Sequence, residues 1–259
     1  MDLRLNDKFA LVTGGSHGIG KCTALSLAEE GCNVAICARN KYRIEDTVKE
    51  IKLRRVESIG IVADVTISEN IDHVIKTVIN SWNTIHILIN NVGGGGRWGS
   101  ENIEETDEKV WLDVYNKNAL AAIRFTTKCI PYMRKQKWGR VVTVSSIYGK
   151  EGGGRPWFNM AKSAEISLMK TLAMTHYLVR DGITFNTVAP GSIMIPDTGW
   201  DIEYRENPDK FKKLIEEFPL GRLGTPEEVA NVITFLCSER ANLINGVCIV
   251  VDGGESRSF

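Results

Sequence analysis

The sequence has no excess of charge of either sign. Lysine and arginine together number 32 among 259 residues, and aspartate and glutamate together also number 32, so the net charge is about zero. Nucleic-acid binding draws on a basic surplus or a clearly basic face, because phosphates dominate the affinity. The basic residues Lys52, Arg54 and Arg55 are few and flanked by apolar residues, a pattern typical of a solvated helix face. We therefore expect no nucleic acid among the partners.

Long apolar runs are also missing. No run approaches the roughly 18 residues that a membrane-spanning helix needs. The N-terminal residues, MDLRLNDKFALVTGG, lack the apolar region of a secretory signal peptide. We therefore expect a cytoplasmic protein with no membrane partner.

The sequence contains no cluster of metal ligands. Its six cysteines include no CxxC pair and lie beside no pair of histidines, and the four histidines are dispersed. Scattered thiols of this kind are typical of buried cysteines in a reducing compartment. The sequence thus predicts neither a metal site nor a disulfide framework.

What the sequence does contain is a regular alternation of short apolar runs and longer segments with helical periodicity. The runs are rich in valine and isoleucine, which favours strands covered on both faces. Repeated strand-then-helix order predicts an α/β fold, a single-domain doubly wound parallel sheet of about seven strands with helices on both faces. The predicted strands are 8–14, 33–38, 58–64, 86–91, 140–146, 183–190 and 246–254, and the predicted helices are about 18–30, 41–56, 67–83, 105–136, 156–180 and 226–238.

One long stretch interrupts this alternation. Residues 191–225 form an irregular connection with a short helix predicted near 208–217. A connection of this length in a compact domain is usually a lid or a binding loop. We expect residues 1–259 to form one dinucleotide-binding domain with a substrate lid at about 191–225.

A glycine-rich segment, TGGSHGIG at 13–20, stands between the first predicted strand and the first predicted helix. Gly14, Gly18 and Gly20 let the backbone approach a pyrophosphate, and the helix N-terminus offers free N–H groups and a positive dipole. At this position the pattern predicts a dinucleotide site.

The end of the second predicted strand distinguishes between the two nicotinamide dinucleotides. NAD sites commonly place an acidic residue there for the ribose 2′-hydroxyl, whereas a nearby arginine suits a 2′-phosphate. This chain has Ala38 at the acidic position, followed by Arg39, which can bind a phosphate bidentately. The sequence therefore favours NADP over NAD, and His17 is either an additional phosphate contact or a solvated residue.

Several motifs along the whole chain resemble those of the short-chain dehydrogenase/reductase family. They are TGGSHGIG, ADV at 63–65, NNVG at 90–93, Asn118, SS at 145–146, PG at 190–191 and VDGG at 251–254. The resemblance implies a Rossmann-type fold, a homotetramer or homodimer, and a 3-oxoacyl reductase-like activity. It also implies that Asp64 and Val65 flank the adenine, that Asn90, Asn91 and Gly93 line the cofactor cleft, and that Ile193 lies near the nicotinamide amide. The expected cofactor-binding set is Gly14, Ser16, His17, Gly18, Ile19, Gly20, Arg39, Asp64, Val65, Asn91, Gly93, Lys162, Pro190, Gly191 and Ile193.

The resemblance also implies a catalytic set of Asn, Ser, Tyr and Lys. The matching positions are Asn118, Ser146 and Lys162, but Phe158 occupies the tyrosine position. In the family the tyrosine transfers the proton, the serine binds the substrate oxygen, the lysine lowers the pKa of the tyrosine and binds the ribose, and the asparagine holds a relay water. Ser146 precedes Phe158 by twelve residues where the family commonly has thirteen, so either the intervening loop is shorter by one residue or Ser145 takes part.

A phenyl ring cannot donate a proton, and four accounts of Phe158 remain open. Phe158 is either an introduced replacement of the tyrosine or a natural residue in a reductase that uses another proton donor. Alternatively, the protein binds the cofactor without turning it over, or the phenyl ring serves only for packing. The alternative donor is a water or Tyr148, which shares the face of Ser146 if the strand continues extended. Tyr148 is otherwise a loop aromatic packed against the lid. We expect Trp157 to line the substrate cavity or pack under the lid, and Glu165 to make a helix or subunit contact.

The sequence thus predicts an NADP(H)-dependent oxidoreductase that transfers hydride between a nicotinamide and a small-molecule carbonyl or secondary alcohol, impaired in this chain by Phe158. The alternative is a non-catalytic dinucleotide-binding regulator or subunit of the same fold. The glycines at 93–96 and the lid residues Asp197, Trp200, Asp201 and Tyr204 are expected to shape the substrate site. In the lid, Ile195 stands where the family commonly has threonine.

Overall fold

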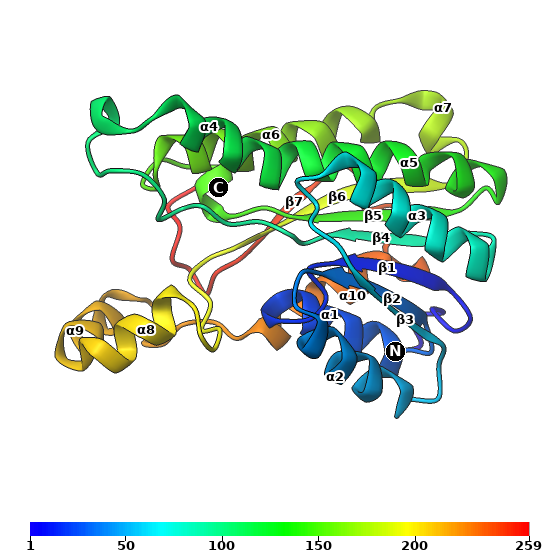
Figure 1. Ribbon diagram of the computed structural model, residues 1–259, viewed down its shortest axis with the longest axis horizontal. Helices are drawn as coiled ribbons and strands as arrows, with labels where there is room; N and C mark the ends of the chain where they lie inside the picture. The colour runs from blue at the N-terminus through cyan, green and yellow to red at the C-terminus, as the bar shows by residue number, and fades with distance from the viewer. Residues whose placement is uncertain (259) are drawn as a thin grey trace.

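A computed structural model describes residues 1–258 of the chain. Its centre is one parallel sheet of seven strands in the order β3-β2-β1-β4-β5-β6-β7 (Figure 1). Strands β5 and β6 are buried along their whole length, as expected where helices cover both faces of a parallel sheet. The strands are β1 Phe9–Thr13, β2 Asn33–Ala38, β3 Ser58–Val62, β4 Ile87–Asn90, β5 Gly139–Val144, β6 Ile183–Pro190 and β7 Cys248–Val251.

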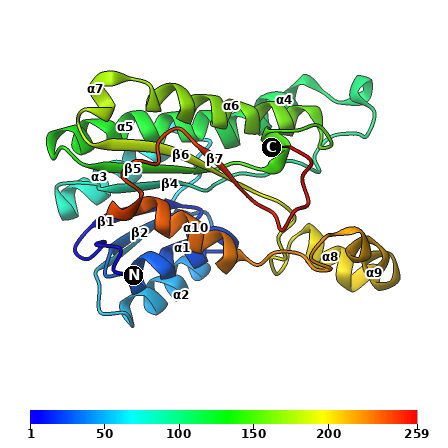
Figure 2. The same ribbon diagram turned by 180° about the vertical axis from the view of Figure 1, so that it is seen from behind.

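Two helical layers enclose this sheet, as the alternating pattern predicts. On one face α1 packs against α2 and α10, and on the other α3, α5 and α6 lie side by side (Figures 1 and 2). Each face has its own apolar core, with Leu27 and Ile233 in one and Val78 and Phe125 in the other. These helices are α1 Gly18–Glu29, α2 Lys41–Lys52, α3 Ser68–Trp82, α5 Ala121–Lys135, α6 Pro156–Ala173 and α10 Pro226–Cys237, and the four-residue α7, His176–Val179, follows α6.

The sheet changes direction between β1 and β4. The chain runs outward from β1 to β3 and then returns to build β4 on the other side of β1. At such a switch point the connections leave the two strands in opposite directions, which opens a crevice at their carboxyl ends. The topology therefore makes the carboxyl ends of β1 and β4 the expected position of a ligand.

The helix predicted at 105–136 is interrupted. The structure has a 3₁₀ turn η1 at Ile103–Glu105, helix α4 at Glu108–Tyr115, a π-helical turn η2 at Asn116–Leu120 and then α5. A π turn adds a residue to the helical turn without ending the helix. Because the apolar pattern continues across the π turn, the sequence pattern does not reveal it. The correction matters for the site because Asn118 lies within the π turn.

The predicted lid contains two helices rather than one. Helix α9, Pro208–Glu217, lies where a short helix was predicted, and α8, Gly199–Glu206, precedes it unpredicted. Together they project from the sheet layers on two long connections (Figure 2). A parallel bridge between Ile193 and Gly224 joins the two connections at their base.

Within residues 1–258, none of the helices combines the length and the apolar character needed to cross a membrane. The same described residues bring together no group of three or more His, Cys, Asp or Glu side chains suited to a metal ion.

Candidate active site

The glycine-rich turn after β1 is held in place by the end of β4. The Asn91 side-chain amide donates a hydrogen bond to Thr13 O at 2.9 Å, and the Thr13 hydroxyl accepts one from Asn91 N, also at 2.9 Å. Gly14 N donates to Cys37 O at 2.8 Å, which ties the turn to β2 as well. The Asn91 side chain is therefore used to brace the turn beside the cleft.

The glycines of this turn are required by geometry. Gly14 and Gly18 have φ values of +66° and +51°, a region that side chains disfavour. A Cβ on Gly20 would lie 2.3 Å from Gly14 O, closer than any side chain permits. Ser16 is buried inside the turn, and Ile19 packs against the apolar core below it. The turn and the N-terminus of α1 together form a cradle in which backbone N–H groups can meet a pyrophosphate.

His17 lies on the rim of this cradle, partly buried, between α1 and the lid connection. Burial is the largest effect lowering its pKa, and the charge of Arg43 lowers it further. Arg43 also pairs with Asp197 at 3.1 Å, which links α2 to the lid. The neutral imidazole therefore predominates at pH 7, which makes His17 a hydrogen-bonding group rather than a cationic phosphate ligand.

Arg39 is exposed at the carboxyl end of β2, directly beside the glycine turn. Nearby, the Asp64 carboxylate accepts hydrogen bonds from Thr66 N at 2.9 Å and from the Thr66 hydroxyl at 2.7 Å. Burial raises the pKa of Asp64, but these bonds and the charge of Arg39 outweigh it, so the pKa falls below its usual value. Val65 is buried next to Asp64. The structure thus places an arginine, a carboxylate and an apolar side chain along one end of the cleft.

Asn118 is fixed at the opposite side of the cleft by the π turn. Its side-chain amide donates to Val114 O at 2.7 Å and to Gly94 O at 2.8 Å, and its Oδ1 accepts from Gly94 N at 3.1 Å. The side chain is completely buried. Asn118 therefore holds the loop after β4 against η2, and its side-chain amide is committed to protein partners.

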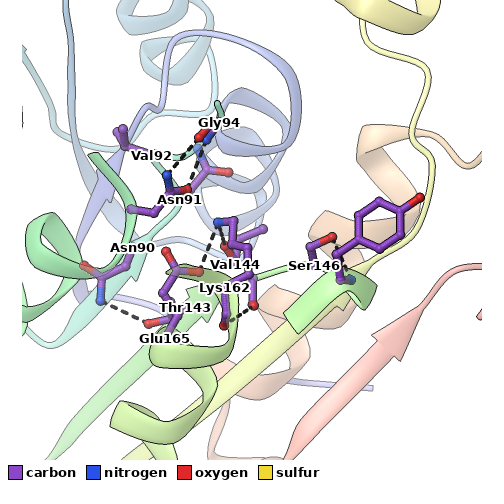
Figure 3. A network of polar contacts seen from close by, with 12 residues as sticks. Asn90, Asn91, Val92, Gly94, Thr143, Val144, Ser146, Lys162 and Glu165 are labelled. Carbon is purple, nitrogen blue, oxygen red and sulfur yellow. Dashed lines mark hydrogen bonds and ion pairs between the residues drawn. The ribbon is translucent and has the colours of Figure 1, made fainter. Parts of the chain in front are cut away.

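Lys162, from α6, meets Asn118 at Gly93. A Cβ on Gly93 would lie 2.8 Å from Asn118 Oδ1 and 2.9 Å from Lys162 Nζ, so only glycine leaves room for both. Lys162 Nζ donates to Val144 O and to Glu165 Oε2, each at 3.0 Å, as Figure 3 shows. Its exposed fraction is 3%. The amine is thus turned inward, between the end of β5 and the loop after β4.

Phe158 lies one turn before Lys162 on the same helix face, and its ring centroid is 5.7 Å from Lys162 Nζ. The ring packs against Gly96, whose Cβ would lie 3.4 Å from the ring, and the side chain remains partly exposed. The structure therefore holds a phenyl ring beside the lysine, on the edge of the 93–96 loop.

Strand β5 ends at Val144, two residues earlier than predicted, and this changes the position of Tyr148. Ser146 begins a 3₁₀ turn, η3 Ile147–Gly149, and its Oγ accepts a hydrogen bond from Tyr148 N at 3.2 Å. The Tyr148 ring packs over Gly153 and Gly154. The premise that Tyr148 shares the face of Ser146 on an extended strand is wrong. Burial, Glu255 and Glu151 all raise the pKa of the Tyr148 phenol, which makes it a weaker acid.

Two neighbours of Phe158 and Lys162 were also given expectations from the sequence. Trp157 is fully buried and packs edge-on against Trp111 of α4, at 5.4 Å between ring centroids, rather than under the lid. The alternation of helix faces explains this, because Trp157 and Phe158 point to different sides of α6. Glu165 has an exposed fraction of 1% and pairs with Lys162, three residues earlier in α6, so it makes the helix contact that was one of the two expectations.

The connection after β6 runs from the end of the sheet to the glycine turn. Pro190 ends β6, and Gly191 N donates to Val251 O at 3.1 Å. Ser192 donates from its backbone N, at 2.6 Å, and from its hydroxyl, at 2.8 Å, to the Glu255 carboxylate, a partner that the sequence motifs did not indicate. Further along, Ile193 is buried, and Ile195 packs against Gly18 of the glycine turn, where a Cβ would lie 3.0 Å from the isoleucine.

Comparison with known proteins agrees with this geometry. A family profile described as enoyl-(acyl carrier protein) reductase matches residues 14–256. The chain is 36% identical over 251 residues to the 3-oxoacyl-[acyl-carrier-protein] reductase FabG of Staphylococcus epidermidis, which covers 96% of this chain and 98% of that protein. It is 32% identical to the (2S)-[(R)-hydroxy(phenyl)methyl]succinyl-CoA dehydrogenase subunit BbsD of Thauera aromatica, over 97% of this chain and 98% of that one.

Among solved structures, L-sorbose reductase from Gluconobacter frateurii, in complex with NADPH and L-sorbose, superposes over the whole of both chains with a TM-score of 0.90 and 31% identity. A single-residue variant of actinorhodin polyketide ketoreductase, with NADPH, gives a TM-score of 0.89 at 29% identity, over 97% of this chain and 98% of that one. Profile, relatives and fold agree over nearly the whole length of the chain. The chain therefore belongs to the short-chain dehydrogenase/reductase family of oxidoreductases.

Proposed function

We propose that this protein is an NADP(H)-dependent oxidoreductase acting on a carbonyl or a secondary alcohol, and that Phe158 impairs its proton-transfer step. The observation that carries the proposal is the meeting of Asn118 and Lys162 at Gly93, beside the crevice between β1 and β4. Two of the residues that match the family's catalytic set thus lie together after β4, the strand next to the proposed dinucleotide cradle.

Arg39 supports NADP as the cofactor. Its exposed guanidinium stands at the end of β2, where a 2′-phosphate is met in dinucleotide folds, and Ala38 leaves no carboxylate to repel it. Two structural neighbours named above were solved with NADPH. The glycine turn is compatible with a dinucleotide, because Gly14 and Gly18 adopt positive φ values just before and at the N-terminus of α1, where backbone N–H groups can meet a pyrophosphate. When bound, the nicotinamide supplies or accepts the hydride.

The remaining chemistry falls to the side chains around the substrate oxygen. The Ser146 hydroxyl is suited to donate a hydrogen bond to a carbonyl oxygen, and Lys162 supplies positive charge near the cleft. Phe158 adds no acidic group and the pKa of Tyr148 is raised, so water held near Ser146 and Lys162 is the donor that we propose. Loss of a positioned general acid typically slows a reaction by about 10² to 10⁴. We therefore propose slow turnover in this chain.

We further propose that residues 1–259 form one domain in which α8 and α9 act as a substrate lid over the 93–96 loop. Arg97, which directly follows this loop, donates to Gly199 O at 3.2 Å, and its guanidinium carbon lies 5.3 Å from the Trp200 ring centroid, so the chain next to the loop contacts the lid. Candidate substrates are 3-oxoacyl thioesters, sugar-derived ketones and secondary alcohols. The names of FabG and of L-sorbose reductase include examples of the first two classes. We also propose that the protein is cytoplasmic and assembles as a homotetramer or a homodimer.

A second candidate function is a non-catalytic dinucleotide-binding subunit of the same fold. The inward position of Lys162 favours it, because both of its bonds go to protein groups, Val144 O and Glu165. One relative is itself described as a dehydrogenase subunit. Both candidates predict dinucleotide binding, so binding by itself does not separate them.

Restoring the phenol separates the two candidates. In the Phe158→Tyr variant, NADPH oxidation over a panel of ketones should rise by roughly 10² to 10⁴ if the reductase lacks only its acid. Phe158→Leu is the matched control, since it changes the ring without adding a hydroxyl, and it should show no gain. If Phe158→Tyr oxidises NADPH no faster with any ketone that demonstrably binds, the subunit function is favoured over the reductase.

A further inference from the structure

The pair formed by Lys162 and Glu165 differs from the other ion pairs that adjacent helical turns make in this protein. Its two side chains have exposed fractions of 4% and 1%, whereas those of the Lys49–Asp46 pair have 75% and 68%. Removing two charges from water is costly, and apolar residues of similar volume are often at least as stable. Stability of the helix is therefore a weak reason for placing a carboxylate at position 165.

The Glu165 carboxylate is the counter-charge that Lys162 contacts. Glu165 Oε2 lies 3.0 Å from Lys162 Nζ, whereas Phe158 offers only the face of a ring 5.7 Å away. A buried lysine without a compensating charge tends to lose its proton, because burial disfavours the charged form. The carboxylate opposes that loss. It also turns the amine toward Val144 O and the position beside Gly93.

An ammonium group carries three N–H donors. The bonds to Val144 O and Glu165 use two of them, and Nζ lies beside Gly93, at the end of β4 where the cleft opens. We propose that Glu165 is a positioning residue for the cofactor: its carboxylate keeps Lys162 protonated and oriented so that the third N–H meets the ribose hydroxyls of the bound dinucleotide. This inference rests on the proposed function, because it requires a dinucleotide in this cleft.

The proposal predicts a particular pH dependence of cofactor binding. Burial raises the pKa of Glu165 to about 7, against the opposing effect of Lys162. Below pH 7 the carboxyl is largely protonated, and Glu165→Gln should resemble the wild type. Above pH 7 only the wild type has the carboxylate. The other charges near Lys162 are Lys117 on η2 and, beyond it, Arg39 and Asp64, all of which are retained in both proteins.

The test is to measure the Kd of NADPH for each protein from the fluorescence of NADPH. Two pH values on either side of about pH 7 are used, for example about 6.0 and about 8.5. Expressing each value as the ratio of Glu165→Gln to wild type cancels the titration of the NADPH phosphate. We expect a ratio near one at the lower pH and about fivefold to tenfold weaker binding at the higher pH, the difference between a charged and a neutral hydrogen-bond donor. Asp46→Asn, which opens the exposed pair with Lys49, should leave both ratios near one.

A ratio that is the same at both pH values would overturn the proposal, since a purely structural glutamate would weaken binding uniformly. If Glu165→Gln does not fold, the wild type and Lys162→Met carry the test. The wild type must then still bind NADPH more tightly than Lys162→Met at the higher pH, and equal affinity of the two proteins at that pH would overturn the proposal. A wild type that binds no NADPH at either pH overturns the proposed function and this inference together.

Discussion

Gly93→Ala is the sharpest single test of how the site is assembled. The new methyl group would lie 2.8 Å from Asn118 Oδ1 and 2.9 Å from Lys162 Nζ, both well inside contact distance. Both residues are buried and held by hydrogen bonds, so their side chains have little room to retreat. Overpacking of this kind typically costs about 1–3 kcal/mol of unfolding free energy.

For a domain of this size that cost corresponds to a Tm lower by roughly 2–10 °C. Because the displaced groups border the cleft, NADPH affinity should fall as well. Thermal unfolding and NADPH titration measure the two effects. Gly152→Ala is the matched control, because a Cβ there would meet no heavy atom of residues 1–258 within 4 Å. Equal Tm and equal NADPH affinity for the two variants would refute the claim that Asn118 and Lys162 converge on Gly93.

Two further predictions concern charge. Arg39→Ala should weaken NADP(H) binding by about tenfold or more and leave NAD(H) binding nearly unchanged, because a charge-assisted bond to the 2′-phosphate is lost. Titration of the variant with both cofactors checks this prediction. An unchanged NADP(H) affinity would contradict the role assigned to Arg39. Burial raises the pKa of Glu165 from an ordinary 4.5 to about 7, so the folded state binds more protons than the unfolded state between these values. This residue's contribution to the unfolding free energy should therefore fall by up to about 3 kcal/mol as the pH rises from 4.5 to 7. Urea unfolding of the wild type should show that slope relative to Lys162→Met/Glu165→Leu, and parallel pH profiles of the two proteins would contradict it.

The strands and the layers were predictable because they depend on local pattern. Near-continuous apolar runs such as 183–190 are buried on both faces wherever helices cover a sheet, and β6 has the predicted bounds. The π turn at Asn116–Leu120 was not predictable in the same way, since the helical pattern passes through it. Helix α8 was missed because it is mostly polar and contributes no buried residue to reveal its period.

In the candidate site, the sequence predicted the types of residue but not the groups that each side chain contacts. The glycine turn, Lys162 and the missing phenol at Phe158 can all be read along the chain. The spacing of Lys162 and Glu165, three residues apart, is equally visible, yet exposed pairs at the same spacing occur elsewhere in the protein, as at Lys49 and Asp46. The Lys162–Glu165 pair is buried and the Lys49–Asp46 pair is exposed. The burial of the first pair depends on the position of β5 beneath α6.

The amino-acid sequence by itself determined the alternation of strands and helices, the dinucleotide cradle and the absence of a phenol at position 158, because each follows from residue type and short-range spacing. Tertiary structure decided where Lys162 points. Its amine meets Val144 O from β5, Glu165 from its own helix and the backbone at Gly93 after β4, and the first and last of these lie far from Lys162 in the chain. Long-range packing brings these two segments to α6, and no local pattern encodes the direction of a side chain that depends on them.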